Sequence, residues 1–195
     1  MLAYVVLLFA VLSRILPHAF HAVNWNFTAV GGGLLFFGSR MGATPGRSAW
    51  QTVAKLASAV AVLVATDYYL TVYAYGYSFH AREYFVTWLW YAAVCLIGMQ
   101  ILQKASVLRV VAGVLASATS FFLLSNFMVW VGGTMTMYPR TLAGLGACYM
   151  AAIPFYRNDV VSTAITAGAL FGLPVLAARI VESLHTAQQD NLPLA

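Results

Sequence analysis

The stretch from Val110 to Val131 reads VVAGVLASATSFFLLSNFMVWV and contains no charged residue. A helix that spans a bilayer needs about 20 predominantly apolar residues, within a range of about 17–25. Inside lipid the backbone amides of such a stretch have to bond within the protein, and an α-helix satisfies nearly all of them within one segment. The stretch therefore predicts a membrane-spanning helix.

Similar apolar stretches occur on both sides of it. Tyr84–Leu102 has the required length, and Val53–Leu70 has it if its end carries Asp67. Val160–Ala178 also qualifies, with Pro174 as an expected kink. We predict an all-α polytopic transmembrane bundle of about six spans, near residues 2–16, 27–39, 53–70, 84–102, 110–131 and 160–178. Leu142–Phe155 is short and has Pro154 near its end, so we expect a half-span or an interfacial helix there.

The composition agrees with a membrane protein. Hydrophobic residues make up 62% of the 195 residues and charged residues 8%, whereas soluble domains have about 45–50% and about 25%. We expect one integral membrane domain over residues 1–195. The ten Lys and Arg exceed the five acidic residues, but they are scattered between apolar runs and form no basic block. They are therefore interpreted as topology signals, and nucleic acid is not expected as a partner.

The distribution of Lys and Arg predicts the orientation, because short cytoplasmic loops carry the excess of positive charge. With six spans, one side of the membrane receives Arg40, Arg47, Lys55, Lys104, Arg109 and Arg179. The other side receives Arg14, Arg82, Arg140 and Arg157. We therefore expect both termini in the cytoplasm of a bacterial cell, with the bundle in the inner membrane. The first apolar segment has no preceding basic residue and no cleavage site, so it is expected to be a retained span.

Motifs of catalysis and phosphate binding are absent. The sequence has no GxSxG, HExxH, GxGxxG or GxxxxGK[ST] pattern, so we expect no enzymatic activity, no catalytic residue and no cofactor. His18 and His21 stand three residues apart, but a zinc site needs further ligands and no Cys or carboxylate lies nearby in the sequence. We therefore expect no metal site. Asn158 or Asp159 is expected to cap the start of the last span.

Glycine residues are concentrated in the second predicted span. Gly31, Gly32 and Gly33 are consecutive, and small residues allow the backbones of two membrane helices to approach closely. We predict that this run lets the second span pack unusually close to a neighbouring helix.

The loops expected on the outer side combine aromatic residues with a few hydrogen-bonding groups. They are Arg14–Phe27, the tyrosine-rich stretch Tyr68–Tyr84, and Ser125–Gly144. An interfacial aromatic belt is one explanation, and a ligand vestibule with aromatic walls is the other. Tyr73, Tyr75 and Tyr77 would point the same way in an extended loop. On the vestibule hypothesis the ligand-binding candidates are Asn26, Asp67, Tyr73, Tyr75, Tyr77, His80, Asn126, Trp130, Tyr138 and Arg140.

Three segments, RILPH…NFTAVGGGLLFFGSR, SNFMVW…MYPRTLAGL and CYMAAIPFYRND, resemble a family of small bacterial integral membrane proteins that is described as transport proteins and has no assigned function. More remotely, the chain is similar in size and layout to the S components of energy-coupling factor vitamin transporters. That resemblance implies a small-molecule site at the outer face. It also implies a separate ATP-driven coupling module as partner, although the first span lacks the Ala-x-x-x-Ala pattern of docking S components, since Ala3 and Ala10 are seven apart.

We therefore expect a transport protein, similar to an S component, that captures a vitamin-like or heterocyclic molecule. Its other partner is membrane lipid. Two alternatives from other classes stay open. One is an intramembrane enzyme or redox-linked protein that uses His18, His21, Asp67 and Cys95, and the other is a structural membrane subunit.

Overall fold

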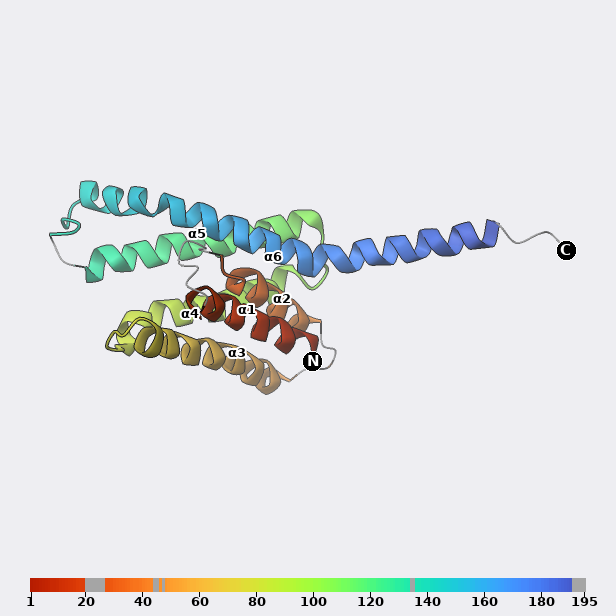
Figure 1. Cartoon of the computed structure of the whole chain (residues 1–195), viewed down its shortest axis with the longest axis horizontal. Coiled ribbons are helices and arrows are strands. Elements are labelled where there is room, and N and C mark those ends of the chain that lie inside the picture. The colour runs from red at the N-terminus through yellow and green to blue at the C-terminus, as the bar shows by residue number, and fades with distance from the viewer. Residues whose placement is uncertain (20–26, 44–45, 47, 134–135, 191–195) are drawn as a thin grey trace.

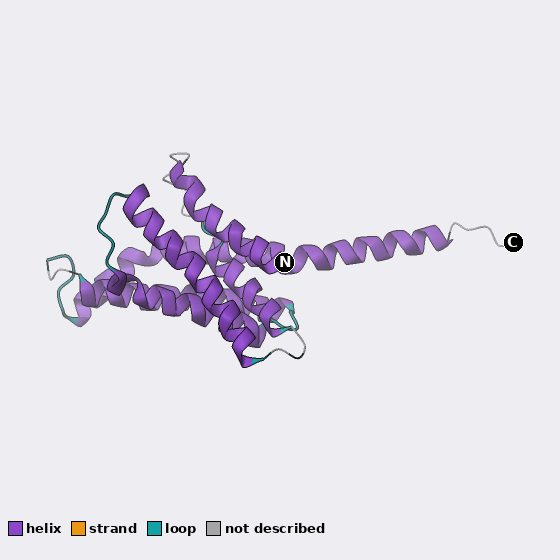
Figure 2. Ribbon diagram, turned by 90° about the horizontal axis from the view of Figure 1, so that it is seen from below, coloured by secondary structure: helices purple, strands orange, loops and turns teal. Residues whose placement is uncertain are grey.

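The computed structural model of the chain describes residues 1–19, 27–43, 46, 48–133 and 136–190, and within these the side chains of all but residues 17, 19 and 184–190. The described residues form helices and loops, without a strand (Figure 2). The predicted all-α class is thus confirmed. The elements are α1 (Leu2–Ala19), α2 (Val30–Gly42), α3 (Ala49–Tyr69), the π-helical turn η1 (Leu70–Ala74), α4 (Ala81–Ile101), α5 (Val107–Gly132) and α6 (Leu142–Asp190).

Four of these helices are long and apolar enough to cross a membrane. They cover Ala49–Ala74, Ala81–Ile101, Val107–Gly132 and, within α6, Leu142–Ser183. Three of them correspond closely to the spans predicted near 53–70, 84–102 and 110–131. The apolar part of α1, Leu2–Leu16, is shorter, and α2 has only 13 residues. The described residues therefore support a polytopic helical bundle with four helices of spanning length.

The expectation of two separate segments after residue 142 is wrong. Residues 142–155 and 160–178 belong to one continuous helix, α6, with Pro154 and Pro174 inside it. A proline removes one hydrogen bond and strains the turn before it, but breaking the helix in apolar surroundings would leave more backbone groups unpaired. Asp159 consequently lies inside α6 and does not cap a helix start.

The length of α6 exceeds the thickness of a bilayer. Its 49 residues extend over about 73 Å at 1.5 Å per residue, whereas the hydrocarbon core is about 30 Å thick. The first part of α6 runs antiparallel to α5, and its last part projects beyond the other helices (Figures 1 and 2).

Helix α2 lies at the centre of the bundle. All of its residues except Arg40 and Gly42 are buried, and it contacts each of the other helices. Its closest neighbour is α4, where a Cβ atom on Gly38 would overlap the carbonyl oxygen of Cys95, and one on Gly98 would overlap that of Leu35. Glycine at both positions therefore permits direct backbone contact between α2 and α4.

Successive helices alternate in direction, so the bundle has two ends (Figure 1). We call the end that holds the last turn of α1, η1, and the start of α4 the tyrosine end, and the α5–α6 loop lies at this end too. The opposite end holds the start of α1 and the ends of α2 and α4, and we call it the terminal end. The projecting part of α6 extends past the terminal end.

Candidate functional site

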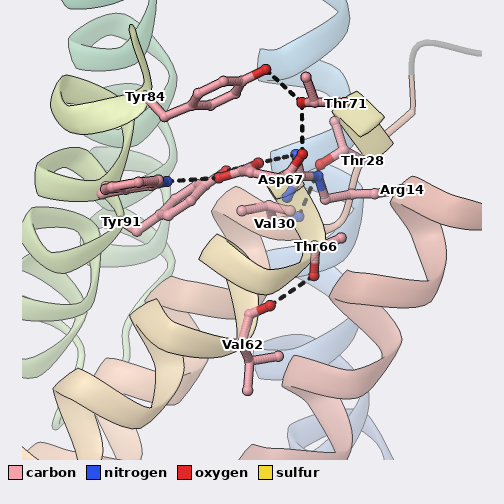
Figure 3. A network of polar contacts seen from close by, with 10 residues as sticks. Arg14, Thr28, Val30, Val62, Thr66, Asp67, Thr71, Tyr84 and Tyr91 are labelled. Atoms are coloured by element: carbon pink, nitrogen blue, oxygen red, sulfur yellow. Dashed lines mark hydrogen bonds and ion pairs between the residues drawn. The ribbon is translucent and has the colours of Figure 1, made fainter. Parts of the chain in front are cut away.

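A buried carboxylate joins three helices near the tyrosine end. Asp67 of α3 is 2% exposed, and its Oδ1 atom accepts a hydrogen bond from Arg14 Nη2 of α1 at 2.5 Å. From α4, Trp88 Nε1 donates to Asp67 Oδ2 at 3.0 Å and the Tyr91 hydroxyl donates to Oδ1 at 3.2 Å. Trp88 and Tyr91 are three residues apart, which places them on one face of α4. Figure 3 shows Arg14 and Tyr91 approaching Asp67 from opposite sides.

This arrangement compensates the charge of Asp67 inside the bundle. A carboxylate in a low-dielectric interior is tolerated when an opposite charge and hydrogen bonds satisfy its oxygens. Both oxygens of Asp67 have donors, and the ion pair with Arg14 cancels the net charge. The Nη1 atom of Arg14 is buried and has no partner among the described residues.

The chain that follows Asp67 forms the π-helical turn η1 in place of an extended loop. Thr71 donates to the carbonyl oxygen of Asp67 at 2.7 Å and shares a 2.7 Å hydrogen bond with the hydroxyl of Tyr84 (Figure 3). The turn ends at Ala74, and two residues later Gly76 has a φ of +70°, which suits glycine. The expectation that the three tyrosines point the same way from an extended loop is therefore wrong, because Tyr73 lies in the helical turn 70–74.

A cavity of about 400 Å³ adjoins the ion pair. Charged and hydroxyl groups of Arg14, Asp67 and Thr71 line it together with aromatic side chains. Its position follows from the shortness of α2. The first turn of α2 packs against the middle of the apolar part of α6, where a Cβ atom on Gly31 would lie 2.6 Å from Thr163 Oγ1. Residues Phe27 and Thr28, just before α2, line the cavity, so the cavity lies between the buried helix and the tyrosine end.

Two further cavities share residues with the first. One of about 230 Å³ lies between α5 and α6, and it shares Phe121, Phe155 and Asp159 with the first cavity. Another of about 580 Å³ lies between the start of α4 and the end of α5, and Phe121 lines it as well. Aromatic walls with a few placed polar groups are typical of small-molecule sites.

Comparison with known families matches residues 1–184 of the chain to the Family of unknown function (DUF6580). The chain belongs to this family. No curated protein and no solved structure matches it. The DUF6580 match extends from α1 into the projecting part of α6, so it contains every residue that lines the three cavities. It links the chain neither to transport nor to S components.

Three of the predicted ligand-binding residues of this DUF6580 protein line a cavity. Asp67 and Tyr75 line the first and Asn126 the second. Trp130 and Arg140 instead brace the α5–α6 loop, because the indole donates to the carbonyl of Pro139 at 2.9 Å and the guanidinium to that of Gly133 at 3.0 Å. The remaining candidates with a described position lie away from these cavities: Tyr73, Tyr77 and His80 are exposed, and Tyr138 is half-buried in the α5–α6 loop. Asn26 and His21 lie outside the described residues.

Sequence reasoning missed the partners of Asp67 and the second carboxylate. The sequence pattern predicts a loop charge for Arg14 and a helix cap for Asp159, yet both line the first cavity of the DUF6580 protein. For Arg14 the signal that could have found it is an ionisable residue flanked by apolar sequence, which is functional by default at membrane depth, whereas Asp159 stands in a polar run that indicates a helix start. Nothing in the spacing pairs Arg14 with Asp67, since 53 residues separate them.

Of the residues proposed for a redox or enzymatic role, His18 and Asp67 both line the first cavity, and the exposed His18 packs edge-on against the ring of Tyr75. Cys95 lies apart from them, fully buried beside α2. Among the described residues of the DUF6580 protein, no three His, Cys, Asp or Glu side chains are placed to hold a metal ion.

Proposed function

We propose that this DUF6580 protein captures a small molecule in the cavity at its tyrosine end, for uptake across the bacterial inner membrane. The observation that carries the proposal is the 400 Å³ cavity, which combines a compensated ion pair, a second carboxylate and aromatic walls inside an apolar bundle. Sites for small molecules have volumes of about 300–1,000 Å³ and the same mixture of apolar walls and a few polar groups.

The distribution of charges supports an outward-facing tyrosine end. Arg14 is paired with Asp67, and Arg157 lies in the middle of α6, so neither is a loop charge. The loops and first helical turn at the tyrosine end retain Arg82 and Arg140. The Lys and Arg on described helix ends and loops toward the terminal end are Arg40, Lys55, Lys104, Arg109 and, on the projecting part of α6, Arg179. Under the positive-inside rule the terminal end is cytoplasmic.

The energy for uptake comes from outside the chain in this proposal, because the sequence has no phosphate-binding loop. In the S components that the chain resembles, a separate ATP-driven module has this role. The capture step needs only the cavity and can be tested on the isolated protein.

The test compares the molecules that the protein retains. Wild type and variants are purified in nanodiscs, exposed to a small-molecule extract of bacterial cells, washed, and analysed by native mass spectrometry. We expect the wild type to retain a non-lipid molecule that Phe155→Ala and Asn126→Ala lose, because Phe155 lines the 400 Å³ cavity and Asn126 lines the 230 Å³ cavity that shares Phe155 with it. Leu108→Ala is the matched control, since Leu108 is 78% exposed on α5 near the terminal end.

Thermal unfolding identifies variants that fail to fold, and only folded variants enter the comparison. Retention of the same molecules by the wild type, Phe155→Ala and Asn126→Ala would contradict the proposal. So would a wild type that retains only lipid.

A further inference from the structure

Asp159 is an acidic side chain of the first cavity with no compensating cation among the described residues. It lines both the 400 Å³ and the 230 Å³ cavity. The hydroxyl of Thr163 donates to its Oδ1 atom at the long distance of 3.4 Å. Among the described residues Asp159 forms no ion pair, whereas Asp67 has Arg14. The two carboxylates of the cavity therefore have different electrostatic environments.

Asp159 lies at mid-depth of the α5–α6 pair. Tyr156, three residues earlier, shares a 2.9 Å hydrogen bond with Thr119, which is near the middle of α5. Thr163, four residues later, lies beside Gly31 at the buried first turn of α2. A charged side chain at such a depth is costly, and it marks a path or site for ions or polar substrates by default.

The charges that line the first cavity sum to a negative value. Arg14 and Asp67 cancel each other through their 2.5 Å ion pair, and Asp159 adds one negative charge. His18 also lines this cavity, and its exposed ring packs edge-on against that of Tyr75. An anion could reach the unpartnered Nη1 of Arg14, but it would also be repelled by Asp159, whereas a cation is attracted by Asp159, which forms no ion pair among the described residues.

We propose that Asp159 binds the positive group of the captured molecule, which makes the substrate class an organic cation with an aromatic or heterocyclic ring. This inference rests on the proposed function and specifies its substrate. Phe121 and Phe155 line the cavity on either side of the α5–α6 contact, and an amine near aromatic faces gains a cation–π attraction in addition to the ion pair. The smaller cavity is lined by the same three side chains and by Tyr156. The aromatic ring of a ligand and its ammonium group would therefore occupy neighbouring positions.

The experiment uses three probes that share one ring and differ in charge. 2-Phenylethylamine is a cation at neutral pH, 2-phenylethanol is neutral, and phenylacetate is an anion. Binding of each to the full chain in nanodiscs is measured by isothermal titration calorimetry. We expect the wild type to bind the amine at least tenfold more tightly than the alcohol, and to bind phenylacetate most weakly.

Variants separate the charge of Asp159 from the shape of the cavity. We expect Asp159→Asn to weaken binding of the amine at least tenfold while leaving that of the alcohol unchanged, and Asp159→Glu to restore part of the preference. Glu83→Gln is the matched control, because Glu83 is an acidic residue on the 580 Å³ cavity only, and it should bind the amine as the wild type does.

Equal binding of amine and alcohol, or amine binding that survives Asp159→Asn, would overturn the assignment of a cation site. So would binding of none of the three probes by the folded wild type. In each case the mass-spectrometric comparison still decides the proposed function separately, because a neutral or anionic molecule retained through Phe155 and Asn126 would support capture without a cation.

Discussion

At the scale of single residues, Asp67 joins more helices than its position at the end of an apolar run indicates. It lies in the last turn of α3, pairs with Arg14 of α1, and accepts hydrogen bonds from Trp88 and Tyr91 of α4. Breaking a buried ion pair by removing one partner is strongly destabilising, because the remaining charge stays buried and uncompensated. Replacing both partners together removes that penalty.

This difference gives a testable prediction. We expect Asp67→Asn to lower the free energy of unfolding by about 3–5 kcal/mol, since the variant leaves the guanidinium of Arg14 without its partner. The double variant Asp67→Asn with Arg14→Met should recover a substantial part of this loss. Unfolding in mixed micelles at increasing SDS, followed by circular dichroism, measures both. A double variant less stable than Asp67→Asn alone would show that the pair does not compensate a buried charge.

At the scale of elements, α2 depends on glycine. The consecutive glycines face different neighbours: Gly31 and Gly32 lie against α6, and a Cβ atom on Gly33 would lie 3.1 Å from that of Ala10 on α1. The sequence prediction that this run lets the second span pack unusually close to a neighbouring helix is confirmed by these distances. Close backbone approach matters in lipid, because packing and hydrogen bonds drive helix association where no water is displaced.

The substitution Gly32→Leu tests the contact between α2 and α6. A Cβ atom at this position would lie 2.7 Å from Thr166 Cβ, so we expect the larger side chain to separate the helices and cost about 1–3 kcal/mol or more. Gly168→Leu is the control, because nothing lies within 4 Å of a Cβ atom there. The thermal midpoint in detergent should fall for Gly32→Leu only. Equal midpoints for the two variants would mean that α2 tolerates a side chain at this contact.

The elements also show how far sequence reasoning reaches. Length and apolarity predict α3, α4 and α5 closely, because in lipid these two properties nearly suffice to specify a helix. They fail for α6, where Pro154 and the polar run that includes Asp159 indicate a break, and packing against α5 maintains the helix through both. The same limit applies to the site. Asp67 stands out as a charge within an apolar span, but its partners depend on which helices meet, and no local pattern specifies that.

At the scale of the whole molecule, a short buried helix explains the location of the cavity. The 13 residues of α2 extend over about 20 Å, which is less than the membrane core of about 30 Å, while four of the helices around it reach full spanning length. Because α2 begins near the middle of the bundle, it leaves a space between its first turn and the tyrosine end, and Arg14, Asp67 and Asp159 line this space. A cavity that lies toward one end of the bundle is useful for capture if that end faces the source of the molecule.

The orientation of the bundle is therefore the last prediction. We expect fusions of a cytoplasmic reporter, such as green fluorescent protein, to fluoresce at Ala195 and after Lys104, because the terminal end carries most of the Lys and Arg outside the bundle interior. A periplasmic reporter, such as alkaline phosphatase, should be active when inserted after Met137 in the α5–α6 loop. Truncated fusions at the same positions control for expression. The reverse pattern, with activity of the periplasmic reporter at Ala195, would turn the cavity toward the cytoplasm and contradict uptake from outside, while leaving the cation site at Asp159 intact as a structural proposal.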